Sequence, residues 1–273
     1  MPELPEVEIW RETLEGWLGG RKIRKASVPD PILRGGQSRA KVEKALEGAT
    51  IGAVGRRGKF LLFDLGARRP AVLVHLGMTG AFERVGKDAP LPKFSRAVLS
   101  LSREERVAFL DTRRLGEFRL VLDKEQKRLD ALGVEPLTRA FTATRLHALT
   151  SRSKRPIKIF LLDQHKIAGI GNIHAAEALF LAGIHPVLPA SELSIDQTRA
   201  LAAAIRQELR GELKRSRDGK LRYLQQGGEN RFRIYGHLGE PCPKCHSKIG
   251  RIVQGGRSTY YCPSCQPDAT TRR

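Results

Sequence analysis

The chain has 273 residues, of which 40% are hydrophobic and 29% charged, a composition that supports a folded core and excludes a disordered tail. Its 49 lysines and arginines against 29 acidic residues give a formal net charge of +20. A surface this basic attracts polyanions, nucleic acid first and anionic membranes second, and argues against a small-molecule enzyme with a neutral surface.

Membrane and secretory destinations are not expected. The longest apolar stretches, such as residues 178–184, are far shorter than the roughly 18–20 residues of a spanning helix. The first eight residues, MPELPEVE, are acidic and broken by proline, whereas a signal peptide is basic and then apolar. The four cysteines cluster near the C-terminal end instead of spreading across the chain as in a disulfide scaffold. We therefore expect a cytoplasmic protein, located with the nucleoid if it is bacterial.

The first half of the chain predicts one helix followed by short strands. Apolar residues at positions 7, 10, 14, 17 and 18 form a helical stripe in residues 3–19, which ends at a pair of glycines. Short apolar runs separated by turn signals then predict strands at 51–54, 59–65, 71–76, 97–101, 106–110 and 117–122. Several strands at this spacing indicate a β-sandwich with the first helix packed against it.

The pattern becomes helical after Pro136. We expect helices at 143–149, 156–162, 172–182 and 196–213, with Ser194 and Gln197 forming a capping box for the last of them. Residues 206–233 are rich in lysine, arginine and glycine, and predict a basic, mobile loop. The chain contains no internal repeat.

The four cysteines are spaced as two Cys-x-x-Cys pairs with sixteen residues between them: Cys242, Cys245, Cys262 and Cys265. Two such turns supply the four thiolates of a tetrahedral Zn²⁺ site, which is structural because no ligand position stays open. Residues 249–253 and 257–261 predict a hairpin that turns at two glycines, and Arg257 on this hairpin is placed to meet phosphate or base. The alternative is a redox pair or incidental thiols.

A glycine-rich turn, Gly169-Ile-Gly-Asn-Ile-His174, lies between two predicted helices. Backbone N–H groups at the start of the second helix favour an anion, which on this basic chain is a DNA phosphate, and Asn172 adds a side-chain donor. The same glycines also fit a simple turn. Lys158 lies in a basic stretch and fits a solvated surface charge equally well.

The N-terminus itself carries potential chemistry. If Met1 is removed, Pro2 becomes a secondary amine with a pKa near ~8, which can attack an aldehyde-like carbon and form an iminium. Glu3 beside it can transfer protons. The alternative is an ordinary N-terminus without a catalytic role.

Five segments resemble those of formamidopyrimidine-DNA glycosylases and occur in the same order over nearly the whole chain. They are MPELPEVE at 1–8, HLGMTG at 75–80, DTRRLG at 111–116, GIGNI at 169–173 and the four-cysteine finger. On these residues the chain is identified as a member of the Fpg/Nei family.

The resemblance implies an α+β protein: an N-terminal helix plus β-sandwich, a helical domain with a helix–two-turn–helix, and a C-terminal β-hairpin zinc finger. The expected domains are 1–132 (catalytic), 133–233 (helical, with a lesion-recognition loop), 234–268 (finger) and a tail at 269–273. The implied partner is double-stranded DNA that contains a damaged base or an abasic site. One structural Zn²⁺ and a monomeric state are expected.

The resemblance also implies roles for individual residues. Pro2 would be the nucleophile at the sugar, Glu3 the proton donor and acceptor, Glu6 a supporting residue, and Lys59 a catalytic-site lysine on a hairpin. Because a base inside a duplex is out of reach, the nucleotide must be flipped out, and three side chains would fill the gap. The gap-filling residues would be Met78, Arg113 and Leu115, and the phosphate contacts Lys158, Asn172 and Arg257.

The implied activity is that of a bifunctional DNA glycosylase and abasic-site lyase. It would remove oxidised purines (8-oxoguanine and formamidopyrimidines) through a Schiff base on Pro2, followed by β,δ-elimination. Two positions depart from the Fpg pattern: Leu115 replaces a usual aromatic residue and Thr112 a usual proline. The segment between Leu213 and Tyr235 is shorter than the loop that covers oxidised guanine in Fpg. The alternatives are a Nei-like glycosylase for oxidised pyrimidines and a non-catalytic zinc-finger protein that binds DNA.

Overall fold

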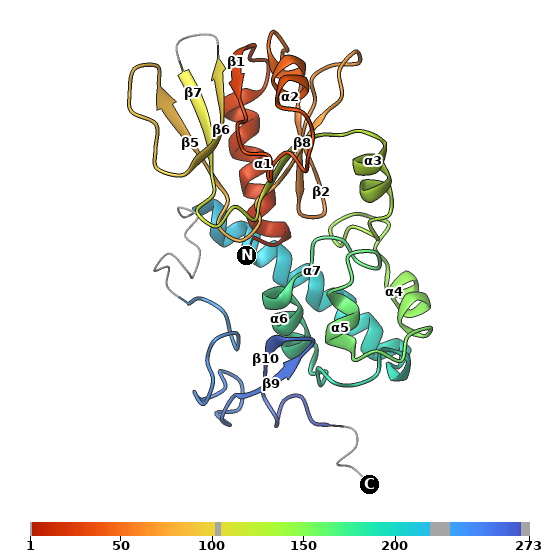
Figure 1. Cartoon of the computed structure of the whole chain (residues 1–273). Helices are drawn as coiled ribbons and strands as arrows, with labels where there is room; N and C mark the ends of the chain where they lie inside the picture. The colour runs from red at the N-terminus through yellow and green to blue at the C-terminus, as the bar shows by residue number, and fades with distance from the viewer. Residues whose placement is uncertain (1, 102–104, 219–229, 269–273) are drawn as a thin grey trace. The chain divides into compact units, whose positions relative to one another are not determined.

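The structure is a computed structural model that describes residues 2–101, 105–218 and 230–268. It divides into two compact units, Met1–Ala131 and Leu132–Arg273, and each contains both helices and strands (Figure 1). The predicted α+β class is confirmed. No helix in the described ranges is long and apolar enough to cross a membrane.

The first unit begins with helix α1 (Leu4–Leu18), within one residue of the predicted range at each end. Pro5 lies in its first turn, where a missing N–H costs nothing because that group has no partner inside the helix. The buried face includes Val7, Leu14 and Leu18, which belong to the core of the sandwich. The helix ends at Gly19.

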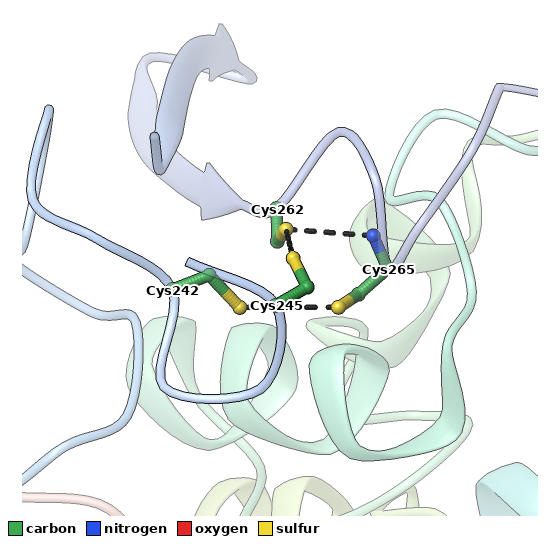
Figure 2. Close-up of side chains that lie close together, drawn as sticks. All are labelled: Cys242, Cys245, Cys262 and Cys265. Carbon is green, nitrogen blue, oxygen red and sulfur yellow. Dashed lines mark hydrogen bonds between the residues drawn. The ribbon is translucent and has the colours of Figure 1, made fainter. Parts of the chain in front are cut away.

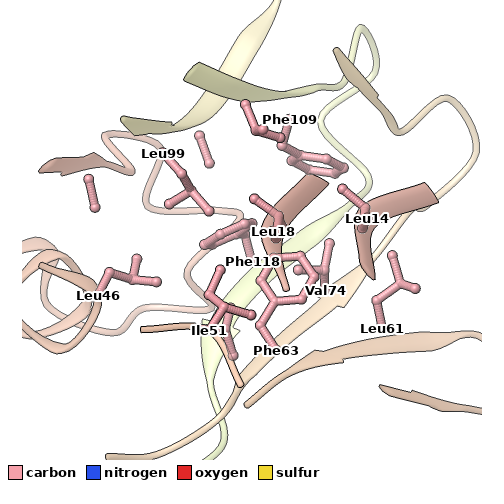
Figure 3. Close-up of a cluster of buried hydrophobic side chains, with 14 of the residues drawn as sticks. Leu14, Leu18, Leu46, Ile51, Leu61, Phe63, Val74, Leu99, Phe109 and Phe118 are labelled. Carbon is pink, nitrogen blue, oxygen red and sulfur yellow. The ribbon is translucent and has the colours of Figure 1, made fainter. Parts of the chain in front are cut away.

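Two four-stranded antiparallel sheets follow, and they form the predicted β-sandwich. One has the order β1 (Ile23–Ser27), β6 (Ser95–Leu101), β7 (Glu105–Leu110) and β5 (Ala81–Gly86). The other has the order β2 (Val54–Arg57), β3 (Phe60–Phe63), β4 (Val72–His75) and β8 (Glu117–Leu120). Side chains from both sheets and from α1 share one buried cluster, as Figure 3 shows for Leu18, Phe63, Leu99, Phe109 and Phe118.

Several elements of the first unit were not predicted from the sequence: β1, β5, helix α2 (Arg39–Leu46) and helix α3 (Asp123–Asp130). Each has few buried apolar residues; β1 buries only its first and fourth, and α2 buries only Val42 and Leu46. The strand expected at 51–54 is shifted, because Val54 pairs with Phe63 at the start of β2, while residues 51–53 lead into it.

The second unit contains helices α4 (Ala143–Thr150), α5 (Ile157–Leu161), α6 (Asn172–Ala182) and α7 (Ile195–Asp218), with a short 3-10 turn at Ala190–Glu192. The predicted capping box of α7 is confirmed: Ser194 N donates to Gln197 Oε1 at 2.9 Å, and Gln197 N donates to Ser194 Oγ at 3.1 Å. The last two strands, β9 (Gly250–Gln254) and β10 (Arg257–Tyr261), form a hairpin.

The prediction of a mobile loop over residues 206–233 is wrong for residues 206–218, whereas residues 230–233 lie outside any helix or strand. Helix α7 continues to Asp218, since its apolar stripe reaches Leu213 and its next turn is held by Glu212, which accepts hydrogen bonds from Arg215 and Ser216. The rest of the predicted loop, residues 219–229, lies outside the described residues, and so does the 269–273 tail.

Candidate functional site

The N-terminal residues are held where α1 begins. Pro2 and Glu3 are both buried, and the Glu3 side chain is 2% exposed. Glu3 has extended backbone, and its N–H donates to Glu6 Oε2 at 2.8 Å. Glu6 therefore fixes the backbone at Glu3, the residue that follows Pro2.

Two hydrogen bonds of Arg56 connect α1 to the turn that carries Lys59. Glu8 on α1 accepts a hydrogen bond from Arg56 Nε at 2.6 Å, and Arg56 Nη1 donates to the carbonyl oxygen of Gly58 at 2.9 Å. Burial alone would raise the pKa of Glu8, but hydrogen bonds from Arg56 and Arg11 hold it below its ordinary value. Lys59 follows Gly58, which has a positive φ of 56°, and is 8% exposed. The structure thus places Lys59 on a hairpin, as the resemblance implies.

The register of the second sheet gathers further segments at one end. Phe60 pairs with His75, and His75 pairs with Glu117, so the loops after β4 and before β8 start from neighbouring strands. Burial lowers the pKa of His75 to about 4, with a further lowering from Lys59. His75 Nδ1 accepts a hydrogen bond from Gly77 N at 3.1 Å, which fits a neutral imidazole.

The three predicted gap-filling residues come together on these two loops. Met78 is partly buried, Arg113 is exposed, and Leu115 is 49% exposed. Arg113 Nη1 lies 3.3 Å from Met78 Sδ, although the two residues are 35 positions apart. The arrangement presents two apolar side chains and a guanidinium at one end of the sandwich, which suits insertion into a base step.

In the second unit, Lys158 is at the centre of a buried polar cluster. Its Nζ donates to Asn172 Oδ1 at 2.6 Å, Thr259 Oγ1 at 2.6 Å and the Ser258 carbonyl oxygen at 3.1 Å. The Asn172 amide in turn donates to Ser258 O at 3.0 Å and to Tyr235 Oη at 3.2 Å. These bonds join α5, the start of α6 and strand β10.

This cluster changes the interpretation of Lys158. Lys158 was predicted to contact a phosphate, but its side chain has no exposed surface and its ammonium is directed at three protein oxygens. A phosphate cannot reach it in this arrangement. Asn172 is partly exposed and Arg257 is exposed beside the turn at Gly256, so these two remain accessible to DNA.

The four cysteines meet at one point, as Figure 2 shows. Their sulfur atoms all lie within 4.8 Å of one another, with Cys242 and Cys265 3.8 Å apart and Cys245 and Cys262 3.4 Å apart. A tetrahedral Zn²⁺ with Zn–S bonds of 2.3 Å requires sulfur atoms about 3.8 Å apart, so the donor set fits this ion.

Backbone donors also surround the sulfur atoms. Lys244 N and Cys265 N each lie 3.4 Å from a cysteine sulfur, in positions that stabilise thiolates. Hydrogen bonds from Ser247 lower the pKa of the Cys245 thiol to about 6. The predicted hairpin turn is confirmed, with Gly255 and Gly256 at φ values of 56° and 72°.

Two residues of this region, Glu177 and Tyr235, were not singled out from the sequence. Glu177 on α6 is fully buried and accepts backbone hydrogen bonds from Arg233, Ile234 and Tyr235 at 2.9–3.0 Å, which places the Tyr235 hydroxyl beside Asn172. A glutamate among the apolar residues of α6 was the available signal, because a buried carboxylate needs donors.

Three family models match the chain in order. They are the formamidopyrimidine-DNA glycosylase N-terminal domain at residues 1–118, the formamidopyrimidine-DNA glycosylase H2TH domain at 132–221, and the zinc finger found in FPG and IleRS at 239–267. The last model supports Zn²⁺ as the ion of the four-cysteine site.

Curated relatives and solved structures agree with these matches. Formamidopyrimidine-DNA glycosylases of Marinobacter nauticus and Chloroflexus aurantiacus are 38% and 39% identical, over 97% of this chain and 100% and 98% of their own. The Lactococcus lactis Fpg in complex with N7-benzyl-Fapy-dG DNA superposes with a TM-score of 0.88 at 31% identity, over 98% of this chain and 100% of that one. MutM in complex with carbocyclic 8-oxo-G DNA has a TM-score of 0.88 and 32% identity, with the same coverage.

Proposed function

The chain belongs to the formamidopyrimidine-DNA glycosylase family, and from this membership we propose that it excises oxidised purines from double-stranded DNA and cleaves the strand at the resulting abasic site. The observation that carries the proposal is the match, over at least 97% of the chain, to relatives in complex with Fapy-dG and 8-oxo-G DNA. Such an enzyme acts in base excision repair.

The proposed chemistry begins at Pro2. With Met1 removed, the unprotonated proline nitrogen attacks C1′ of the damaged nucleotide, the bond from C1′ to the base breaks, and the base leaves with a proton. The C1′–O4′ bond then breaks as the proline nitrogen loses its proton and O4′ gains one, and the product is an iminium between Pro2 and the opened sugar. The iminium acidifies the 2′ hydrogen; its removal expels the 3′ phosphate, and a second elimination expels the 5′ phosphate. Water then releases the sugar fragment and regenerates the amine.

The surrounding residues assist these steps. Glu3, buried beside Pro2, donates and accepts the protons, and Glu6 keeps the backbone of both residues in place. Lys59, on the turn that Arg56 connects to α1, supplies positive charge that stabilises the departing phosphates.

DNA binding is divided between the two units. Met78, Arg113 and Leu115 fill the gap that the flipped nucleotide leaves. Asn172 and the exposed Arg257 contact phosphates, while Lys158 acts from inside the domain by holding Asn172 against β10. The net charge of +20 supports this assignment.

When bound, Zn²⁺ holds the two ends of the finger hairpin together and takes no part in the reaction, because four cysteines occupy its coordination sphere. We also propose that the protein is a monomer and works in the cytoplasm, at the nucleoid if the cell is bacterial, because its substrate is chromosomal DNA.

Oxidised purines are the first choice of substrate, and oxidised pyrimidines are the second. The second choice is supported by Leu115, which lacks the aromatic ring usual in the Fpg branch, and by a Lactococcus lactis Fpg complex with oxidised-pyrimidine DNA that matches with a TM-score of 0.87. An excision panel on duplexes that contain 8-oxoguanine, a ring-opened purine or thymine glycol separates the two. We expect faster release of both purine lesions; faster release of thymine glycol would contradict the purine assignment.

Borohydride trapping on an abasic-site duplex tests the enzyme itself. The wild-type protein is expected to form a covalent adduct, and Pro2→Gly or a form that retains Met1 is expected to lose it. Pro5→Gly is the matched control, since the nitrogen of Pro5 is an amide within α1 and its loss leaves the adduct intact. A non-catalytic DNA-binding protein would give no adduct in any form, and that result would refute the proposed activity.

A further inference from the structure

A single buried carboxylate joins the two loops that carry the gap-filling residues. Asp111 is fully buried at the end of β7. Its Oδ1 accepts hydrogen bonds from Thr79 Oγ1 at 2.7 Å and from Arg113 N at 3.2 Å, and its Oδ2 accepts one from Gly116 N at 2.7 Å. One side chain therefore contacts the loop of Met78 and both ends of the loop that carries Arg113 and Leu115.

The two loops also touch along their backbones. A Cβ atom on Gly77 would lie 2.6–2.7 Å from backbone atoms of Leu115 and Gly116, and one on Gly116 would lie 2.9 Å from the carbonyl oxygen of His75. Gly77 has a positive φ of 59°. Only glycine permits this close approach, so the loops form one closely fitted unit around Asp111.

A third segment joins the same residue through its backbone. Asp111 N donates to the carbonyl oxygen of Phe94 at 3.1 Å, and Arg96 Nε donates to the carbonyl oxygen of Asp111 at 2.9 Å. These bonds hold the backbone of Asp111 in place from Phe94, just before β6, and from Arg96 within β6. The Cα atom of Asp111 therefore has little freedom to follow a loop that moves.

The gap-filling side chains depend on this arrangement because they are not held by the core. Arg113 and Leu115 are exposed and Met78 is only partly buried, so the backbones of the two loops set their directions. We propose that Asp111 is a positioning residue that keeps Met78, Arg113 and Leu115 in the mutual arrangement needed to occupy the gap in the DNA. This inference rests on the proposed function. It assigns to Asp111 no contact with DNA and no part in proton transfer.

The bond between the loops can be removed without touching the carboxylate. Thr79→Val deletes the hydroxyl and keeps the shape of the side chain, whereas Thr79→Ser keeps the hydroxyl. Thr79→Val removes the hydrogen bond to the Asp111 carboxylate and the longer one that Thr79 Oγ1 accepts from Arg113 N at 3.4 Å. We expect it to slow excision of 8-oxoguanine from a duplex about tenfold, mainly through the loss of the bond to the charged acceptor. Cleavage at a preformed abasic site is measured with enzyme at saturating concentration, so that neither the unstacking of a damaged base nor the affinity limits the rate, and it stays within about twofold. Thr79→Ser restores excision.

A 2-aminopurine placed opposite the lesion reports on the gap directly. Its fluorescence rises when neighbouring bases unstack, and we expect a smaller rise with Thr79→Val than with the wild type or Thr79→Ser. Equal excision by the Val and Ser variants, or an equal loss on both DNA substrates, would overturn the proposal.

Amide hydrogen exchange in the free protein tests the same unit without any activity. Asp111→Asn places an NH₂ group either against Gly116 N or against both Arg113 N and the Thr79 hydroxyl. Exchange at the amide of Arg113 or of Gly116 is therefore expected to become at least about tenfold faster. Asp30→Asn is the matched control, because Asp30 binds the Arg114 side chain of the same loop at 2.7 Å without reaching the loop of Met78. Unchanged exchange in Asp111→Asn would refute the inference. If the wild-type protein is inactive on both DNA substrates while Asp111→Asn still shows the faster exchange, only the proposed function is refuted.

Discussion

Replacing Lys158 with methionine separates a structural role of this lysine from a phosphate contact. Methionine keeps the aliphatic length of the side chain and removes its three N–H donors. Asn172 Oδ1 and Thr259 Oγ1 lose a partner at 2.6 Å, whereas the Ser258 carbonyl oxygen still accepts from the Asn172 amide at 3.0 Å. A buried acceptor, Thr259 Oγ1, and a partly buried one, Asn172 Oδ1, are therefore left without this donor.

The expected loss of stability follows from these two acceptors. Each buried acceptor without a donor costs about 1–1.5 kcal/mol, so Lys158→Met destabilises the second unit by about 2–3 kcal/mol. For a unit of this size the midpoint of thermal unfolding falls by about 6–10 °C. Lys154→Met is the matched control, because Lys154 is exposed and its replacement changes the free energy of unfolding by less than about 0.5 kcal/mol.

Calorimetry and DNA titration measure the two possible roles side by side. Loss of a phosphate contact reduces the slope of log affinity against log salt by about one, while loss of hydrogen bonds inside the protein leaves that slope unchanged. We expect a lower unfolding midpoint with an unchanged slope. An unchanged midpoint together with a slope reduced by about one would show that Lys158 reaches DNA, and would refute the assignment.

Three further predictions concern acid stability, the metal and the opposite base. His75 has a folded-state pKa of about 4 against an ordinary 6.5, so the unfolded chain gains a proton first as the pH falls. Between pH 6.5 and 5 this group lowers the free energy of unfolding by about 2 kcal/mol. Urea titrations should show a smaller drop in His75→Asn, whose Oδ1 still accepts a hydrogen bond from Gly77 N. Equal drops in the two proteins would contradict the effect of burial on His75. Chelation of the metal or Cys245→Ser should abolish DNA binding. The fluorescence of the two tryptophans, which both lie in α1 and report on the first unit, should not change. Unchanged affinity for DNA would refute the role of the finger. Leu115→Phe should tighten binding to abasic DNA at least about fivefold by adding one stacking contact, and Leu115→Ala should weaken it; equal affinities would show that this side chain does not enter the gap.

The features that the sequence predicted correctly depend on local patterns. Helix α1 follows from its apolar spacing and terminal glycines, and the finger hairpin follows from two Cys-x-x-Cys turns with Gly255-Gly256 between the strands. In both cases the residues that determine the structure lie within about twenty positions of each other. A single sequence displays such patterns directly.

The features that could not be predicted depend on distant partners. Lys158 lies in a basic stretch, and its burial results from Ser258 and Thr259, which are 100 and 101 positions away. Likewise, Asp111 is part of the DTRRLG segment, but its partner Thr79 is 32 positions away. Charge and spacing along the chain do not reveal contacts of this kind.

The central claim is that the nitrogen of Pro2 forms the covalent bond to DNA, and peptide mapping of the trapped complex tests it most directly. The enzyme is joined to abasic DNA with borohydride, digested with nuclease and protease, and analysed by mass spectrometry. We predict that the reduced sugar fragment is attached to the N-terminal peptide at Pro2. Attachment at Lys59 or at any other residue would contradict the mechanism.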